Sequence, residues 1–151
     1  MEALAECILS GRRKRLLGSK PLFVRYRAVS ADGLRQLEAQ LGIQFPESLQ
    51  QWLLLVGYGD VKEDLSFRAE WFSLVENGAL KGNVIFAQDI LGNFYAFDPQ
   101  GGKVFFFSRS TPEYAAIAMD FQSFMEELER REFKIIDWMD SLPLLPYDWN
   151  A

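Results

Sequence analysis

The side chains with the greatest capacity for chemistry in this chain are carboxylates. Asp60, Glu63 and Asp64 lie within five consecutive positions, and Asp89 and Asp98 flank one predicted strand. Such groups could hold a cation or form an acid–base pair of the kind that glycosidases use. The first three do not follow the calcium-loop pattern of alternating oxygens, central glycine and terminal glutamate. Asp89 and Asp98 sit beside turns, where aspartate commonly bonds the local backbone, so we expect turn or surface roles rather than catalysis.

The residues that most enzymes and metal sites need are missing from the sequence. It has no histidine, which removes the commonest general base and the commonest metal ligand. Cys7 is the only thiol, so a zinc site of the Cys/His type and an intrachain disulfide are both excluded. Neither the dinucleotide-binding glycine pattern nor the phosphate-loop pattern occurs. We therefore expect a protein that is not an enzyme and that binds no cofactor and no metal.

Charge is distributed unevenly along the 151 residues. Residues 1–20 hold five basic and two acidic side chains, a net charge of +3, whereas the rest hold 11 basic and 19 acidic ones, a net charge of −8. The acidic part disfavours nucleic acid and favours basic protein partners. The basic run at residues 12–15 could be a nucleic-acid or lipid patch. A solvated helix end, where cations favour the C-terminal dipole, is the simpler interpretation.

No secretion signal or membrane span is predicted. The chain starts with an acidic segment whose apolar run is too short for a signal peptide, and no stretch approaches the roughly 18 apolar residues of a membrane helix. A lone cysteine also suits a reducing compartment. We expect a cytoplasmic protein without membrane contacts.

Helical patterns occur towards both ends of the chain, and the helices that they predict must help to position the carboxylates. Residues 4–9 predict a short N-terminal helix, and residues 22–27 predict a strand or an extended lead-in. Ser30 is a suitable N-cap for the next helix, and Gly42 is a suitable stop. These signals place one complete helix between the two residues.

Two further helices are predicted, from signals at their ends and from the spacing of apolar residues along one face. Pro46 suits the first position of a helix, Trp52 lies on its apolar face, and Gly57 is a natural left-handed stop. The last long helix should begin after Asp120 and repeat the same apolar spacing. The segment that follows, residues 135–151, is too apolar for a disordered tail, so it should dock on its own core or on a partner.

Strands are predicted between the helices. Aromatic and β-branched residues are concentrated at residues 67–75, 84–87, 94–98 and 104–108. The links between these segments are short, which favours antiparallel hairpins over parallel crossovers.

The predicted fold is therefore α+β in a single domain. It has N-terminal helices, a central and mostly antiparallel sheet of about 4–6 strands, and a C-terminal helix packed on the sheet. Residues 1–29 would form the N-terminal helix and lead-in, residues 30–130 the core domain, and residues 131–151 an apolar C-terminal extension.

The order of these motifs resembles the SUKH superfamily, which comprises Smi/Knr-type fungal cell-wall regulators and bacterial immunity proteins. The resemblance covers roughly residues 30–130. It is carried by Leu41-Gly42-Ile43, Phe45-Pro46, Trp52-Leu53, Gly57-Tyr58-Gly59-Asp60, the stretch from Phe86 to Asp98, Val104-Phe105-Phe106-Phe107 and the stretch from Ile117 to Met125.

The resemblance implies a non-catalytic protein-binding domain, in the bacterial members an immunity protein that neutralises a toxin domain by occluding its active site. Such toxins are often basic nucleases or deaminases, which the charge of −8 would complement. The implied partner is a protein, with no direct contact to nucleic acid, and the chain would be a monomer or weak homodimer. The candidate contacts, chosen from their placement in loops, are Tyr58, Asp60, Glu63, Asp64, Asp89 and Asp98.

Two alternatives remain open. The first is a regulatory or scaffold module of the same fold, in which the apolar tail would dock or dimerise. The second is a small enzyme that uses carboxylates alone, with Asp89 and Asp98 as its candidates.

Overall fold

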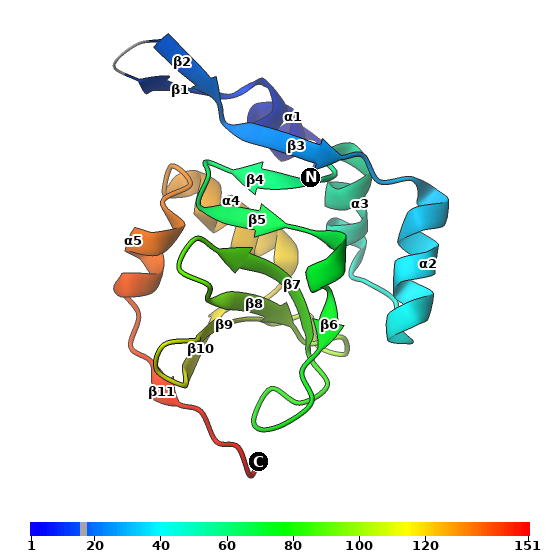
Figure 1. Ribbon diagram of the computed structural model, residues 1–151, viewed down its shortest axis with the longest axis vertical. Coiled ribbons are helices and arrows are strands. Elements are labelled where there is room, and N and C mark those ends of the chain that lie inside the picture. The colour runs from blue at the N-terminus through cyan, green and yellow to red at the C-terminus, as the bar shows by residue number, and fades with distance from the viewer. Residues whose placement is uncertain (16–17) are drawn as a thin grey trace.

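A computed structural model describes residues 1–15 and 18–151, with the backbone alone described for residues 12–15. The helices and strands of this part of the chain are arranged as an antiparallel sheet with helices packed against it (Figure 1). The helices are α1 (Glu2–Ser10), α2 (Ala31–Leu41), α3 (Glu47–Leu55), the single-turn η1 (Ala69–Trp71), α4 (Phe121–Arg130) and α5 (Ile135–Asp140).

One large sheet runs through the molecule. Within the described residues its strands are β3 (Phe23–Arg27), β4 (Tyr58–Val61), β5 (Leu65–Phe67), β6 (Ser73–Leu74), β7 (Val84–Asp89), β8 (Phe94–Phe97), β9 (Val104–Ser108), β10 (Glu113–Ala118) and β11 (Leu145–Pro146). Their spatial order is β11-β10-β9-β8-β7-β5-β4-β3, and β6 pairs with the remaining length of β7. Every pairing is antiparallel. The α+β class is confirmed, but the predicted strand number of about 4–6 is too low.

The additional strands come from segments that the sequence patterns assigned differently. The Gly57-Tyr58-Gly59-Asp60 exit of α3 is predicted to be a loop, and most of it forms β4. Strand β10, which ends at Ile117 and Ala118, lies in a segment for which no strand is predicted. The predicted strand at residues 67–75 is divided by η1 into the end of β5 and all of β6.

The predicted helix ends are largely confirmed. The Ser30 hydroxyl accepts from the Gly33 amide at 3.0 Å, and Gly42 ends α2 with φ 68°. Asp120 caps α4 by accepting from the Ser123 amide at 2.7 Å. Pro46 lies one position earlier than predicted, because it is the N-cap of α3 rather than its first helical residue.

The basic run is not a helix end. Helix α1 stops at Ser10, and Arg12–Arg15 forms strand β1, which pairs with β2 (Gly18–Pro21) as a separate two-stranded hairpin. The charge–dipole interpretation of this run is therefore wrong, and its side chains lie outside the described part of the structure.

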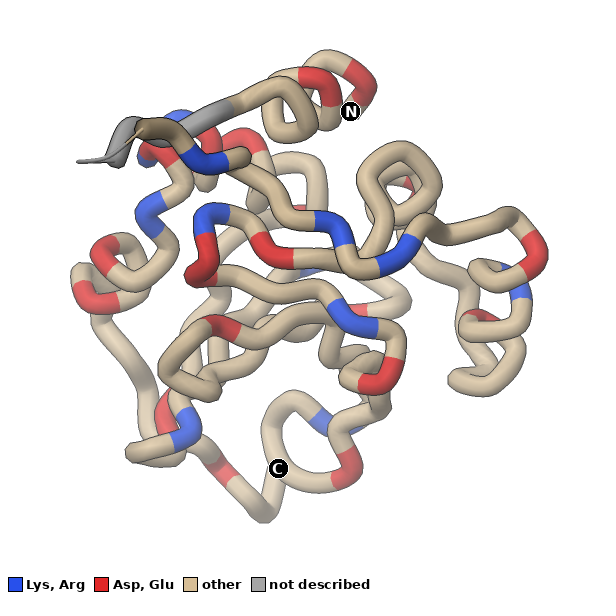
Figure 2. The backbone as a smooth tube through the Cα atoms, turned by 45° about the horizontal axis from the view of Figure 1, so that its top comes forward, with Lys and Arg blue, Asp and Glu red and all other residues tan. Residues whose placement is uncertain are grey.

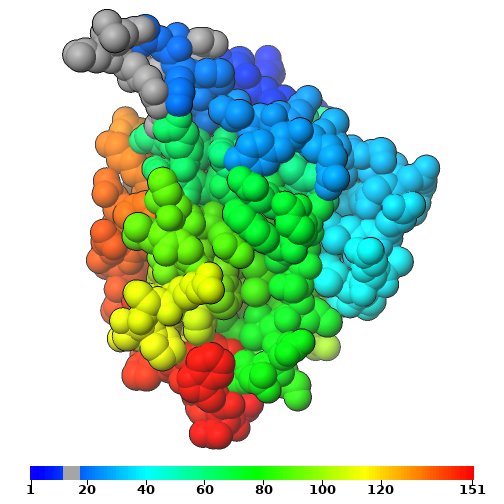
Figure 3. All heavy atoms as spheres, in the orientation of Figure 1, coloured from blue at the N-terminus to red at the C-terminus, as the bar shows by residue number. Residues whose placement is uncertain are grey.

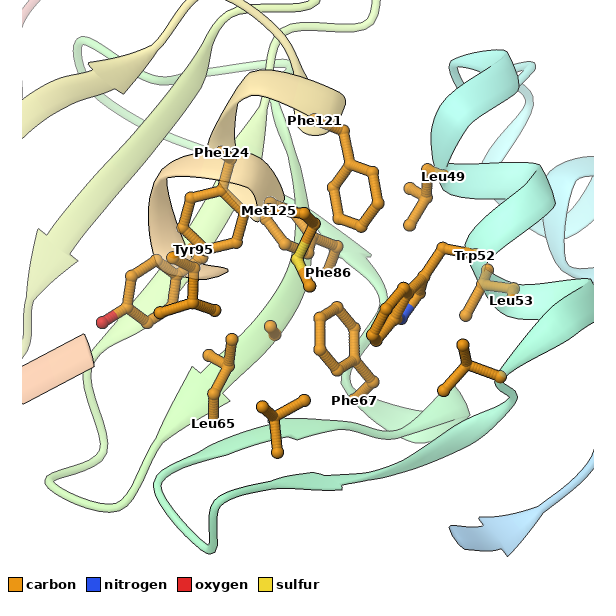
Figure 4. Packing of buried hydrophobic residues seen from close by; sticks show 14 of the residues in the cluster. Leu49, Trp52, Leu53, Leu65, Phe67, Phe86, Tyr95, Phe121, Phe124 and Met125 are labelled. Carbon is orange, nitrogen blue, oxygen red and sulfur yellow. The ribbon is translucent and has the colours of Figure 1, made fainter. Parts of the chain in front are cut away.

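Aromatic rings form the main core between the sheet and the helices. Helices α1, α3 and α4 lie behind the sheet in the view of Figure 1, and α2 lies at its side. Trp52 of α3 is completely buried and contacts the rings of Phe67 and Phe121, with centroids 5.4 and 6.3 Å away. Phe86 of β7 joins the same cluster through Phe121 and Phe124, and Figure 4 shows these side chains converging from α3, α4 and the sheet.

The apolar tail packs on its own chain. Ile135 and Trp138 of α5 are buried in the main core. Further on, β11 pairs with β10, and the buried Tyr147 hydroxyl donates to the Asn77 carbonyl at 2.6 Å and accepts from the Leu80 amide at 3.1 Å. Figure 3 shows this C-terminal segment seated between the strands and the loop that contains residues 75–83.

Arg25 on β3 links the sheet to the end of α3. Its Nε donates to the Val56 carbonyl at 2.7 Å and its Nη2 to the Leu55 carbonyl at 3.3 Å. Helix C-terminal carbonyls lack partners inside the helix, so a cation at this position both satisfies them and complements the dipole.

Replacing Arg25 by alanine should therefore lower the free energy of unfolding by about 1–2 kcal/mol, because two carbonyls lose a charged donor. Urea titration followed by circular dichroism would measure the change. Arg35→Ala is the matched control, since Arg35 pairs with Asp32 on the exposed surface of α2 and should contribute less than about 0.5 kcal/mol. Equal losses in the two variants would contradict the capping role.

Candidate partner-binding site

The sheet face opposite the helices is polar at one end and aromatic at the other. Cross-strand pairing aligns one outward-facing row across seven strands, in the order Val24, Asp60, Ser66, Gln88, Phe94, Phe107 and Tyr114. The aromatic end is covered in part by the tail, where Tyr147 packs against Phe107 at 4.7 Å. The polar end, over β3, β4 and β5, is the part of this face that remains open to a partner.

A hydrogen-bonded cluster occupies the polar end. The Tyr26 hydroxyl and the Ser66 hydroxyl each donate to one oxygen of the Asp60 carboxylate. The Tyr26 oxygen in turn accepts from Arg68 Nη2 at 3.2 Å. Figure 2 shows that positions of both charge signs follow one another along these strands. Asp60 is thus an internal acceptor of the cluster as well as a surface carboxylate.

Two arginines are held against aromatic rings beside this cluster. The Arg68 guanidinium carbon lies 4.6 Å from the ring centre of Tyr26 and 4.9 Å from that of Trp71. The Arg27 guanidinium carbon lies 5.3 Å from the ring centre of Tyr58. Such cation–π contacts restrict otherwise flexible side chains. The pairs therefore present ordered guanidinium groups at the surface.

A groove runs from the cluster towards α2. Its smaller lobe has a volume of about 260 Å³ and lies among Tyr26, Arg27, Tyr58, Arg68 and Glu70. Its larger lobe, of about 570 Å³, shares Arg27, Tyr58 and Glu70 and continues along α2. Burial raises the pKa of the Tyr58 hydroxyl, so this group, which is protonated at neutral pH in any case, stays a hydrogen-bond donor into more alkaline conditions.

The other acidic candidates lie away from the groove or inside turns. Glu63, in the turn between β4 and β5, forms an ion pair with Lys20 of β2. The Asp64 carbonyl accepts from the Ile90 amide at 2.9 Å, which ties this turn to the β7–β8 hairpin. The Asp98 carboxylate accepts from the Gln100 amide at 3.0 Å within the turn after β8.

Asp89 is buried in the β7–β8 hairpin. One carboxylate oxygen accepts from the amides of Leu91 and Asn93 at 3.0 and 3.1 Å. The other accepts from the Asn93 side chain at 3.2 Å and from the Tyr95 hydroxyl at 2.8 Å. Burial and the adjacent carboxylate raise the pKa of Tyr95 well above its ordinary value, which keeps its hydroxyl a donor. The turn role that the sequence predicts for Asp89 is the one observed.

The comparison with protein families identifies the fold's relatives. The sequence model of the SMI1 / KNR4 family (SUKH-1) matches residues 28–127. The chain belongs to this family. Comparisons with curated proteins and with solved structures gave no significant match. Membership of SUKH-1 supports a protein-binding domain with an immunity or regulatory role, and the matched region includes most of the groove.

Among the described residues, no group of three or more histidine, cysteine, aspartate or glutamate side chains has a metal-binding arrangement. None of the described helices combines the length and apolarity required for crossing a membrane.

Of the residues that line the groove of this SUKH-1 chain, Tyr58 was named from the sequence, and Asp60 on the same strand belongs to the adjoining hydrogen-bonded cluster. Tyr26, Arg27 and Arg68 were not expected from the sequence. They come from segments 41 or more positions apart and meet only through the pairing of β3, β4 and β5. The available signal was the Arg-Tyr-Arg run at positions 25–27 and the position of Arg68 between Phe67 and Trp71.

Proposed function

We propose that this SUKH-1 protein is a cytoplasmic immunity protein that binds a toxin domain and occludes its active site without catalysing a reaction. The observation that carries the proposal is the open groove bordered by ordered tyrosine and arginine side chains. Tyrosine, tryptophan and arginine dominate the binding energy of protein interfaces.

The charge of the body supports a basic partner. Residues 21–151 carry a net charge of −8, which steers a basic nuclease or deaminase domain towards the protein. A non-catalytic role fits the carboxylates, because Asp89 and Asp98 both accept hydrogen bonds from their own turns.

Co-expression with the toxin encoded by an adjacent reading frame tests the proposal. We expect growth to be restored and the two proteins to elute as one complex from a sizing column. With the Tyr26→Ala variant, at least tenfold more protein should be required for rescue and for complex formation. Arg109→Ala, which changes an exposed residue after β9, should leave both requirements unchanged. Undiminished toxicity together with separate elution would reject the proposal for that toxin.

The regulatory alternative keeps the support of the family match, but not through the first part of the apolar tail. A tail that dimerises through Ile135 and Trp138 would require these side chains to be exposed, and both are buried in the chain's own core. The expected monomer or weak homodimer stays a prediction that light scattering on the full-length protein can check.

A further inference from the structure

Two arginines at the groove have no acidic partner. Within the described part of the chain, neither Arg27 nor Arg68 forms an ion pair, although carboxylates are the commonest charged groups in the sequence. The carboxylate of Asp60, on strand β4, already accepts from the hydroxyls of Tyr26 and Ser66. These two guanidinium groups are therefore free to bind an anion from outside the chain.

The hydrogen bonds of Arg68 are also incomplete. A guanidinium has five N–H donors, and the Tyr26 oxygen is the one acceptor that the described residues supply. Its Nε is buried without any partner. Because two rings lie against the guanidinium, a ligand must approach its remaining N–H groups at the edge. Edge-on approach to two N–H groups is the geometry that a carboxylate matches.

The local charge contrasts with the rest of the protein. The smaller lobe is lined by two cations, Arg27 and Arg68, and one exposed carboxylate, Glu70, which leaves an excess of one positive charge. The surrounding body is strongly negative. An acidic group is thus favoured at this lobe, whereas the net charge of residues 21–151 disfavours acidic groups on average, and such a contrast contributes to specificity.

The two lobes differ in what they can hold. The smaller, at about 260 Å³, is below the range of about 300–1,000 Å³ that small-molecule sites occupy, so one side chain fits it better than a cofactor. The larger lobe is lined along α2 by polar residues such as Gln36 and Gln40, whose amides can both donate to and accept from a peptide backbone.

We infer that the groove binds an acidic segment of the partner protein, with an Asp or Glu carboxylate seated in the smaller lobe between Arg27 and Arg68 and the adjoining backbone in the larger lobe. The inference rests on the proposed function for its biological setting and names the partner's chemistry. The partner is a protein with a basic surface whose contact region includes a segment with an Asp or Glu side chain.

The test uses the full-length protein labelled with nitrogen-15 and two neutral-ended amino acids as probes. N-acetyl-glutamate amide supplies the carboxylate, and N-acetyl-glutamine amide has the same shape without the charge. We expect the acidic probe to produce saturable shifts at the amides of Arg27, Tyr58, Arg68 and Glu70, with millimolar affinity, and the neutral probe to bind at least tenfold more weakly. Equal binding of the two probes, or shifts elsewhere, would overturn the inference.

Variants and a second anion sharpen the result. Arg68→Gln and Arg27→Gln should each weaken binding of the acidic probe at least fivefold, and Arg109→Gln should leave it unchanged. Thermal melts identify any variant that fails to fold. If one of the two arginine variants fails to fold, probe binding by the other variant decides the outcome. Tighter binding of inorganic phosphate than of the acidic probe would overturn the carboxylate assignment. Because no toxin is present, these results stand apart from those of the rescue experiment.

Discussion

Replacing Gly59 by alanine should lower the free energy of unfolding by about 3 kcal/mol, because β4 lies too close to β3 for a side chain at this position. A Cβ there would overlap the Val24 carbonyl oxygen and would lie 2.6 Å from Cζ of Phe23 and 3.0 Å from Cα of Arg25. Two of these contacts are with backbone, which can yield only if the strands separate. Urea denaturation followed by tryptophan fluorescence would measure the loss.

Gly82→Ala is a control that separates steric overlap from the left-handed backbone conformation, which is the other reason that a position requires glycine. Gly82 has φ 86° but no atom within 4 Å of the added Cβ, so its substitution tests the left-handed backbone alone. We expect a loss of about 1 kcal/mol, as for a single strained residue. A Gly59→Ala variant as stable as Gly82→Ala would show that the two strands are less tightly paired than described.

Asp89→Ala should lower the free energy of unfolding by about 2–4 kcal/mol, because it removes a charged acceptor and leaves buried donors unpaired. The Tyr95 hydroxyl would lose its acceptor within a fully buried environment, and the amides of Leu91 and Asn93 would lose theirs in the turn. Coupled polar groups of this kind contribute more than their separate bonds suggest. Thermal and urea denaturation would both report the change.

Two milder variants identify the source of the loss. Asp89→Asn keeps one acceptor oxygen and should cost about 1–2 kcal/mol, and Tyr95→Phe removes a donor together with its need for an acceptor and should cost less. Partner binding, measured on protein that remains folded, should be similar in Asp89→Asn and in the natural chain. A stable Asp89→Ala protein that has lost only its binding would contradict the structural role.

The helices were predictable because their signals are local. Ser30, Gly42 and Asp120 act through hydrogen bonds to residues within three or four positions, so their roles can be read from short windows. Trp52 was also assigned correctly to the core, since its position in the apolar spacing of α3 decides which side it faces.

The failure to predict some of the strands has a physical explanation. Gly57 and Gly59 indicate a loop by composition, yet here they allow β4 to approach β3 closely, a requirement that depends on a neighbour some 35 positions away. Strand β10 contains three alanines, which favour helices in isolation, and its pairing with β9 outweighs that preference.

The groove could be predicted only in part for the same reason. Tyr58 and Asp60 are only two positions apart in sequence, but Arg68 reaches Tyr26 across 42 positions and Arg27 reaches Tyr58 across 31. No local pattern specifies such meetings. They follow from the strand order, which itself becomes clear only when β4 is recognised.

The strand order also affects how the chain can fold during synthesis. From β3 to β11, the strands of the main path lie side by side in the order in which the ribosome makes them. Each strand can therefore pair with one that is already present, which keeps loop closures short and the search for partners limited. Helix α4, whose Phe121 and Phe124 cover the rings of the central strands, is made after all the strands that it covers. Part of the aromatic face of the nascent sheet therefore stays uncovered until α4 follows, and we expect the protein to depend most on chaperones before that point.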